Sequence, residues 1–258
     1  MSYVATDAAG YERSMGRWSR ALAEPFLDAL ALPEGLRVLD AGCGTGALSA
    51  AILKRDRTAQ LTGVDLGVAF VEAARAALPQ ARFEQGDIAN LPLADATQDA
   101  ALALLVLGFV PDPAAATAEL RRVTRPGGLV ATAMWDFFGG FPFLRLFADT
   151  AAALLPEAAA WRARHWHAPI GSPGRLGALF AGAGLHDISE TDIAIRQDFA
   201  DFDDWWSPWL TGQGIVGAFI AGLEPAPRVM LEAALRRAWG TDGPRSFAAT
   251  ARLVVGRA

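Results

Sequence analysis

The chain has 258 residues, of which 52% are hydrophobic and 20% are charged, and its formal net charge is −5. This composition excludes an intrinsically disordered chain, and the length is sufficient for the core of one large domain. The mildly acidic balance disfavours a nucleic-acid-binding surface, which is normally basic. The single cysteine excludes an intrachain disulfide and a cysteine-based zinc cluster, and with three histidines we expect no metal site.

Hydropathy sets an expectation about location. The longest apolar run, residues 100–110, is too short to span a membrane and suits a buried strand. The N-terminal segment lacks the apolar core of a signal peptide. We therefore expect a cytoplasmic protein without a membrane span, either a monomer or a homodimer.

Short apolar runs alternate with amphipathic runs along the first half of the chain. Strands are expected at 36–40, 60–65, 82–87, 100–107 and 128–135, and helices at 47–54, 68–78 and 113–123. The run at 100–107 is almost entirely apolar, as expected for a strand that is covered on both faces. Strands that alternate with helices favour right-handed crossovers and a parallel sheet.

The second half of the chain has a different pattern. Residues 137–170 and 199–243 are irregular and rich in aromatic side chains, whereas 172–183 predicts a helix and 185–195 and 246–256 predict strands. Residues 1–32 are expected to form a mostly helical N-terminal element. We therefore expect one domain over residues 1–258, in which the two irregular segments are cap insertions.

The most informative stretch is V-L-D-A-G-C-G-T-G at residues 38–46. Three glycines in five residues, between a strand and a helix, allow positive φ and a close approach of the backbone to a ligand. No lysine lies nearby, which excludes a phosphate-binding P-loop. Gly42, Gly44 and Ala47 fit the dinucleotide pattern G-x-G-x-x-[GA], and Asp65 follows at the distance of a ribose contact.

Asp40, at the end of the first strand, helps to distinguish a dinucleotide from a cationic ligand. A carboxylate repels a pyrophosphate, whereas it attracts a cation by about 1 kcal/mol or more once the pair is partly shielded from water. S-adenosylmethionine carries a sulfonium and an ammonium and no phosphate. Asp40 therefore favours this cofactor over NAD.

The segment from 38 to 46 resembles the first motif of class I S-adenosylmethionine-dependent methyltransferases. The sequences G-D-I at 86–88 and R-R-V-T-R-P-G-G at 121–128 resemble later motifs of that family in order and spacing. Residues 11–20, 107–113 and 201–209 resemble the bacterial type 11 group, which contains ubiquinone/menaquinone C-methylase-like enzymes. The resemblance implies a Rossmann-like, doubly wound α/β fold with seven strands in the order 3-2-1-4-5-7-6, strand seven antiparallel, and helical cap insertions.

The resemblance also implies roles for residues at the carboxyl ends of the strands. Asp65 would bind the ribose hydroxyls, Asp87 would accept from the adenine amino group, and Ile88 would offer a backbone N–H and an apolar face to the ring. The complete set of cofactor-binding candidates is Asp40, Gly42, Cys43, Gly44, Gly46, Asp65, Leu66, Asp87, Ile88 and Leu104.

The methyl acceptor is expected between the sheet rim and the insertions, because the aromatic side chains gather there. An aromatic-rich site suits a small aromatic or apolar molecule. Core packing is the more common role for any single Trp. The acceptor-binding candidates are Tyr11, Arg13, Trp18, Trp135, Trp166, Trp206 and Gln213, and the candidate general bases are Asp136, His165 and His167.

The leading hypothesis is a methyltransferase (EC 2.1.1.-) that acts on a small molecule with S-adenosylmethionine. An NAD(P)-dependent oxidoreductase is the first alternative, but Lys54, the only lysine, cannot supply a Tyr-x-x-x-Lys site. A protein that binds the cofactor or a hydrophobic ligand without chemistry is the second. A nucleic-acid or protein acceptor is disfavoured, because L-V-L-G at 105–108 replaces the tetrapeptide of amino-modifying enzymes.

Overall fold

The computed structural model describes residues 12–258 except 138, 167–169, 213 and 241–242, and for Arg13, Ser14 and Trp166 it describes the backbone alone. In this part of the chain, seven strands form one sheet in the order β3-β2-β1-β4-β5-β7-β6. Their bounds are β1 (Arg37–Ala41), β2 (Gln60–Asp65), β3 (Arg82–Gln85), β4 (Gln98–Leu104), β5 (Thr124–Trp135), β6 (His186–Phe199) and β7 (Arg245–Arg257).

The directions of the strands agree with the expected fold. β1 pairs in parallel with β2 and β4, β2 with β3, and β4 with β5. The N–H of Gly127, near the start of β5, donates to the carbonyl of Ala258, and the N–H of Asp136 donates to that of Thr250. The end of β7 therefore lies beside the start of β5, and β7 is antiparallel. The predicted strand order and the single antiparallel strand are confirmed.

The chain divides into two compact units. The first unit contains Met1–Met134, Ile170–Ile193 and Ala251–Ala258, and the second contains Trp135–Pro169 and Ala194–Thr250. In the described part of the first unit the helical elements are η1 (Glu12–Gly16), α2 (Arg17–Leu30), α3 (Ala47–Arg55), α4 (Val68–Ala77), α5 (Pro113–Val123) and α8 (Arg175–Gly182).

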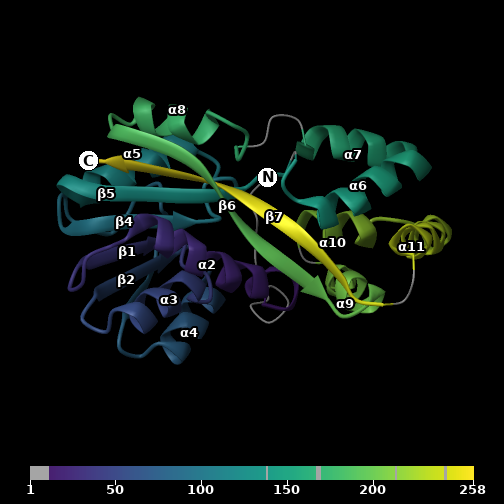
Figure 1. The fold of residues 1–258 in the computed structure, drawn as a ribbon, viewed down its shortest axis with the longest axis horizontal. Helices are drawn as coiled ribbons and strands as arrows, with labels where there is room; N and C mark the ends of the chain where they lie inside the picture. Colours follow the sequence, from purple (N-terminus) through teal and green to yellow (C-terminus); the bar gives the residue numbers. More distant parts are fainter. Residues whose placement is uncertain (1–11, 138, 167–169, 213, 241–242) are drawn as a thin grey trace. The chain divides into compact units, whose positions relative to one another are not determined.

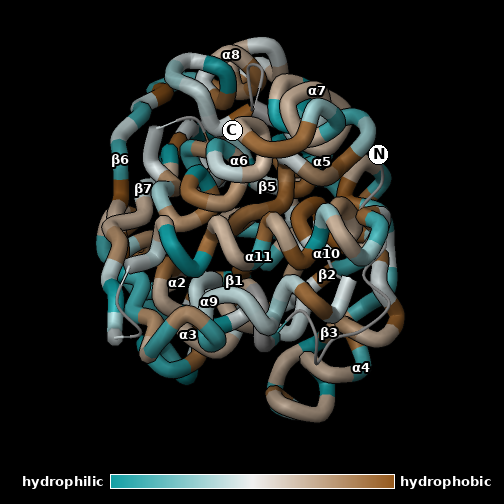
Figure 2. The backbone as a smooth tube through the Cα atoms, turned by 90° about the vertical axis from the view of Figure 1, so that its right-hand side faces the viewer, coloured by the Kyte–Doolittle hydropathy of each residue, from teal (hydrophilic) through white to brown (hydrophobic). Residues whose placement is uncertain are grey.

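Helices cover both faces of the sheet in the first unit. Figure 1 shows α2, α3 and α4 on one face and α5 and α8 on the other. α2 packs against α3, and α5 packs against α8. Residues 100–104 of β4 and residues 128–135 of β5 are all buried, and Figure 2 colours much of β5 as hydrophobic. The alternation of apolar strands and amphipathic helices therefore predicted this layering correctly.

Several predicted boundaries differ from the structure by a few residues, and two of them bear on the site. The strand expected at 100–107 ends at Leu104, because Leu105 has a φ of +61° and leaves the sheet. The strand expected at 128–135 begins earlier, at Thr124, so part of the expected R-P-G-G turn lies within β5. At the start of α5 the prediction is confirmed, since the carboxylate of Asp112 accepts from the N–H groups of Ala114 and Ala115.

The second unit contains a cluster of buried aromatic side chains. Its described helical elements are α6 (Pro142–Leu154), α7 (Pro156–Trp166), α9 (Phe202–Trp206), η2 (Ser207–Thr211), α10 (Gly214–Ala221) and α11 (Pro225–Trp239). α6 packs against α7 and α11. Trp205 stacks on Trp239 with ring centroids 5.4 Å apart, and Phe143 stacks on Trp209 at 6.0 Å. Among the described residues, no helix is long and apolar enough to cross a membrane.

Candidate cofactor-binding site

The glycine turn joins β1 to α3 and has left-handed backbone at all three glycines. The φ angles are +72° at Gly42, +53° at Gly44 and +91° at Gly46. A Cβ atom at Gly42 would collide with the side chain of Val106, whereas one at Gly44 would meet nothing within 4 Å. The turn therefore requires glycine for its backbone, and its surface beside Gly44 is open to a ligand. Cys43 is 6% exposed, and burial raises the pKa of its thiol.

Asp40 lies at the end of the first strand, immediately before this turn. Its side chain is 1% exposed, and its Oδ2 atom accepts a hydrogen bond of 2.6 Å from the hydroxyl of Ser49 on α3. Burial raises the pKa of Asp40 to about 7, and the hydrogen bond from Ser49 opposes part of that increase. A cavity of about 30 Å³ adjoins it, lined by Ser19, Asp40, Gly42, Cys43, Gly44, Thr45, Ala47, Leu48 and Leu104. The carboxyl group is thus buried beside the open turn, where a cation would favour its charged form.

Asp65 ends β2 and is tied to the same turn. One carboxylate oxygen accepts from the N–H of Gly44 at 2.9 Å, and the other accepts from the N–H of Gly67 at 2.8 Å. Burial raises the pKa of Asp65, and these backbone donors act in the opposite direction. Each oxygen has a second lone pair for a further donor. Leu66 follows with 66% of its surface exposed, as an apolar side chain beside a polar one.

The residues after β3 are arranged differently from the expectation. Asp87 is exposed, and its Oδ1 atom accepts from the N–H of Ala89 at 2.8 Å. The side chain of Ile88 is 4% exposed and packs in the hydrophobic core, so it does not present the expected apolar face. The exposed apolar side chain near these strand ends is Leu66. Leu104 ends β4 and lines the cavity.

The N-terminal element contacts the glycine turn through η1. The hydroxyl of Thr45 donates to the carboxylate of Glu12, which also pairs with the guanidinium of Arg20. Trp18 is 6% exposed, and the guanidinium of Arg17 lies 4.3 Å from its ring centroid. Two acceptor-binding candidates of this element are not characterised: Tyr11 is outside the described residues, and so is the side chain of Arg13.

Most acceptor-site candidates belong to the second unit, and two of those described there are buried. Trp135 is 1% exposed and stacks on Phe141 with centroids 4.8 Å apart, and Trp206 is 2% exposed. Asp136 accepts from the N–H of Gly139 at 3.0 Å, and His165 Nδ1 lies 2.8 Å from the carbonyl oxygen of Trp161. The remaining candidates lie outside the described residues or have undescribed side chains: Trp166, His167 and Gln213.

Several residues around the candidate site were absent from the sequence-based candidates. Ser49 donates to Asp40, Ser19 and Thr45 line the cavity, and the side chain of Val106 fills the space that a Cβ at Gly42 would need. Ser49 was detectable in principle, because a polar residue within an apolar helix face needs a buried partner. No local pattern distinguishes the others from ordinary residues of a helix, turn or loop. Within the described part of the chain, no three His, Cys, Asp or Glu side chains converge as a metal site requires.

A doubly wound sheet of this order, with a glycine turn after its first strand and acids at successive strand ends, defines the class I methyltransferase fold. The comparisons with known proteins agree. Residues 39–132 match a family model described as "Methyltransferase domain". A trans-aconitate 2-methyltransferase of Methylobacterium radiotolerans is 31% identical over 255 residues, which cover 90% of this chain and 93% of that protein.

Other relatives match over shorter segments. A trans-aconitate 2-methyltransferase of Variovorax paradoxus is 36% identical over 68% of this chain, and a malonyl-[acyl-carrier protein] O-methyltransferase of Serratia marcescens is 36% identical over 48%. The chain spans 64% and 50% of the lengths of these two proteins. Haemonchus contortus phosphoethanolamine N-methyltransferase 2, solved with S-adenosyl-L-methionine, shares the fold with a TM-score of 0.58 and 14% identity, over 99% of this chain and 57% of that one. The chain belongs to the class I S-adenosylmethionine-dependent methyltransferases, in the type 11 group.

Proposed function

We propose that this protein transfers a methyl group from S-adenosylmethionine to a small-molecule acceptor, an activity of class EC 2.1.1.-. The observation that carries the proposal is the buried carboxyl of Asp40 beside the open glycine turn. A buried carboxylate without a protein cation is costly, and a cationic ligand compensates that cost. A pyrophosphate at the same place would increase it, so an NAD-type ligand is disfavoured.

The residues at the strand ends fit the parts of this cofactor. Asp40 would face its cationic amino-acid end, and the backbone at Gly44 would allow close approach. Asp65 would accept from the ribose hydroxyls with its remaining lone pairs, and Leu66 would cover an apolar face of the nucleoside. Asp87 would accept from the adenine amino group. When bound, the cofactor supplies an electrophilic methyl group, and these residues hold and orient it.

The acceptor is proposed to be a small molecule with an aromatic or apolar body and oxygen acceptors. The buried indole N–H groups of four tryptophans in the second unit have no hydrogen-bond partner among the described residues: Trp135, Trp205, Trp206 and Trp209. An unsatisfied buried donor costs roughly 1–3 kcal/mol, and a ligand oxygen relieves that cost. Trans-aconitate and malonyl-[acyl-carrier protein], which two relatives are named for, both carry such oxygens. Asp136, His165 and His167 stay the candidate bases for an acceptor that arrives protonated.

The first experiment measures cofactor choice by calorimetry with S-adenosylmethionine, S-adenosylhomocysteine and NADH. We expect the first two to bind and NADH not to bind. Asp40→Asn should weaken binding of S-adenosylmethionine at least tenfold, whereas the control Asp99→Asn, which changes a carboxylate at the opposite end of the strands, should not. Binding of NADH alone would overturn the proposal.

The second experiment measures turnover. The protein is incubated with methyl-labelled S-adenosylmethionine and a panel of aromatic carboxylic acids, aliphatic polycarboxylic acids and their neutral amides. We expect labelled product and S-adenosylhomocysteine from acids and not from amides. If the cofactor binds but no compound of the panel leads to S-adenosylhomocysteine, a protein that binds the cofactor without chemistry would be favoured.

A further inference from the structure

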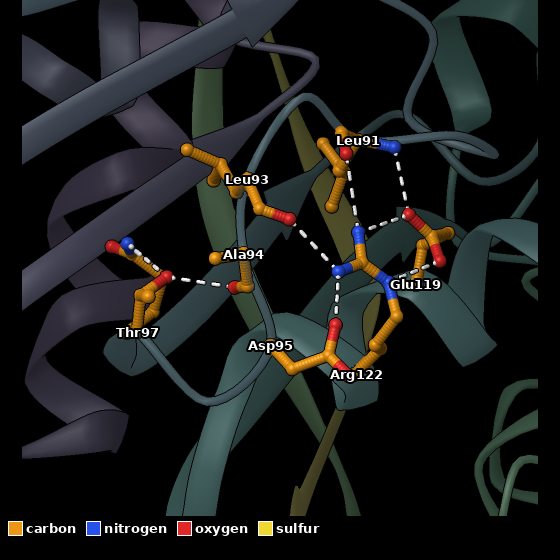
Figure 3. A network of polar contacts seen from close by, with 8 residues as sticks. Leu91, Leu93, Ala94, Asp95, Thr97, Glu119 and Arg122 are labelled. Carbon is orange, nitrogen blue, oxygen red and sulfur yellow. Dashed lines mark hydrogen bonds and ion pairs between the residues drawn. The ribbon is translucent and has the colours of Figure 1, made fainter.

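The loop between β3 and β4 is anchored to α5 by two side chains, Arg122 and Glu119 (Figure 3). The N–H of Leu91 donates to Glu119 Oε2 at 2.8 Å, and the carbonyl of the same residue accepts from Arg122 Nη2 at 3.1 Å. The carbonyl of Leu93 accepts from Arg122 Nη1 at 2.8 Å. The backbone carbonyl of Arg122 also accepts from the N–H of Ala96 at 2.9 Å. The partners of these backbone groups of the loop therefore lie on α5 and not on a neighbouring strand.

All five N–H donors of the Arg122 guanidinium have acceptors in this network. Nε and Nη2 each donate to one oxygen of Glu119 at 2.6 Å, and Nη1 donates to Asp95 at 2.6 Å. The two remaining donors are those that reach the carbonyls of Leu91 and Leu93. These bonds raise the pKa of Arg122 and lower that of Glu119. A lysine has three donors on one nitrogen, so it cannot reproduce this planar arrangement.

The anchored loop begins directly after the turn that carries Asp87. The N–H of Asn90 donates to the carbonyl of Asp87 at 2.9 Å, and the same two residues form an antiparallel bridge. Leu91 is the next residue, and its side chain is 4% exposed within the same core cluster as Ile88. The turn is thus fixed by β3 on one side and by the Leu91 anchor on the other. Asp87 itself is exposed, and among the described residues no hydrogen bond or ion pair joins its side chain to Arg122.

We propose that Arg122 and Glu119 are positioning residues that aim the Asp87 carboxylate at the base of the nucleoside, and so determine selectivity for adenine over other purines. This inference rests on the proposed function. The adenine amino group is a hydrogen-bond donor to a carboxylate, whereas hypoxanthine presents a carbonyl oxygen at the same position and is repelled. Loss of the anchor lets the turn move and reduces this discrimination.

The test is the ratio of the two Kd values for S-adenosylhomocysteine and its inosine counterpart, measured by calorimetry. We expect the wild-type chain to favour the adenine ligand by at least about tenfold, and Asp87→Asn to lose most of that preference. Arg122→Lys should weaken adenine-ligand binding by about five- to tenfold and bring the ratio to within about threefold of unity. The double variant Asp87→Asn with Arg122→Lys should bind S-adenosylhomocysteine no more than about twofold more weakly than Asp87→Asn alone. The reason is that both changes act through the contact of residue 87 with the base.

Arg37→Lys is the matched control. The guanidinium of Arg37 also donates two hydrogen bonds to one carboxylate, that of Asp99, but it lies at the other end of the strands. This variant should leave the ratio unchanged. If Arg122→Lys does not fold, Glu119→Gln provides the second variant, because it weakens the same anchor by replacing the carboxylate with an amide of similar shape. The ratio should then fall in Glu119→Gln.

The outcomes separate the two proposals. A lower melting temperature of Arg122→Lys with an unchanged ratio would overturn the positioning role and leave the proposed function intact. Equal Kd values of the wild-type chain for the adenine and inosine ligands would also overturn the positioning role and leave the proposed function intact. A wild-type chain that binds neither ligand would overturn the proposed function and this inference with it.

Discussion

At the scale of single residues, Asp40 is the group through which we expect the proposed cofactor site to respond to pH. Its pKa is raised to about 7 by burial, and the ordinary value of an aspartate is about 4. Below pH 7 the folded protein therefore holds this carboxyl neutral. A cationic ligand favours the ionised form, so binding is coupled to release of the proton.

We predict that affinity for S-adenosylmethionine increases roughly tenfold between pH 6 and pH 7.5, because the ionised fraction of Asp40 increases by about that factor. Calorimetry over this range checks the slope. Asp40→Asn should bind more weakly and show a flat profile. An unchanged slope in that variant would assign the pH dependence to another group.

The same carboxyl affects stability in the opposite direction. Between pH 4 and pH 7 the folded chain holds a proton that the unfolded chain has released, so the free energy of unfolding falls as pH rises through this window. The hydroxyl of Ser49 donates a hydrogen bond to the buried carboxyl of Asp40. The buried acid is thus a site where binding and stability have conflicting requirements.

Asp40→Asn should therefore raise the melting temperature of the ligand-free protein at pH 8 by at least about 3 °C, with a smaller gain at pH 5. Calorimetric scans at the two pH values measure the difference. Ser49→Ala serves as the comparison, because it removes the hydrogen bond and keeps the acid. We expect that variant to be less stable than the wild-type chain at pH 8, and a gain in stability there would contradict this account.

At the scale of elements, the sequence predicted the first unit well, because strand and helix periodicities alternate without interruption. One boundary that failed is the end of β4, where Leu105 has positive φ. Nothing in an apolar run of Leu and Val indicates where the backbone leaves the sheet, since a non-glycine residue in this conformation is stabilised by its surroundings. Val106, which follows it, fills the space beside Gly42.

This contact predicts different costs for two substitutions in the glycine turn. Gly44→Ala should cost about 1 kcal/mol, because positive φ disfavours a side chain even in open space. Gly42→Ala should cost at least about 2 kcal/mol, because its Cβ also collides with Val106. Denaturant unfolding measures both.

The double variant Gly42→Ala with Val106→Ala is the control for this prediction. It should be more stable than the sum of the two single changes, because the smaller side chain makes room for the new methyl group. Simple additivity would show that backbone strain, rather than the collision, determines the cost at Gly42.

At the scale of the whole molecule, the acids at the two ends of the strands have pKa values shifted in opposite directions. Asp99 is the second residue of β4. Its carboxylate accepts from the N–H and the guanidinium of Arg37 on β1 and from the guanidinium of Arg125 on β5. These bonds, chiefly those from Arg37, lower the pKa of Asp99. The acids at the opposite ends, Asp40 and Asp65, have raised pKa values.

We predict that Asp99→Asn lowers the melting temperature by no more than about 3 °C at neutral pH and leaves cofactor affinity unchanged. The difference should shrink in high salt, and it should decrease steadily as the pH falls from about 4 towards the lowered pKa of Asp99, because the stabilisation by the ionised carboxylate is lost over that range. Thermal scans at two salt concentrations check this. A large loss of cofactor affinity would contradict the separation of roles.

The cofactor site was more predictable than the acceptor site for a physical reason. Glycines and acids at strand ends have few structural uses, so the sequence alone singled out Gly42, Asp40 and Asp65 as candidates, and the structure places them around one turn. A tryptophan serves equally in a core or in a ligand site, and burial of Trp135 and Trp206 agrees with the commoner role. Ile88 is a second example of a residue type that serves equally in a core or in a ligand site. Its apolar side chain is buried in the core, whereas that of Leu66 is exposed.

The distribution of indoles between the two units has a spectroscopic consequence. Seven of the eight tryptophans, all except Trp18, belong to the second unit, whereas every proposed cofactor-binding residue belongs to the first. Intrinsic fluorescence therefore reports almost entirely on one unit, and a nucleoside ligand acts on the other. A ligand-dependent shift of the fluorescence melting curve would measure directly how cooperatively the two units unfold, without any added label.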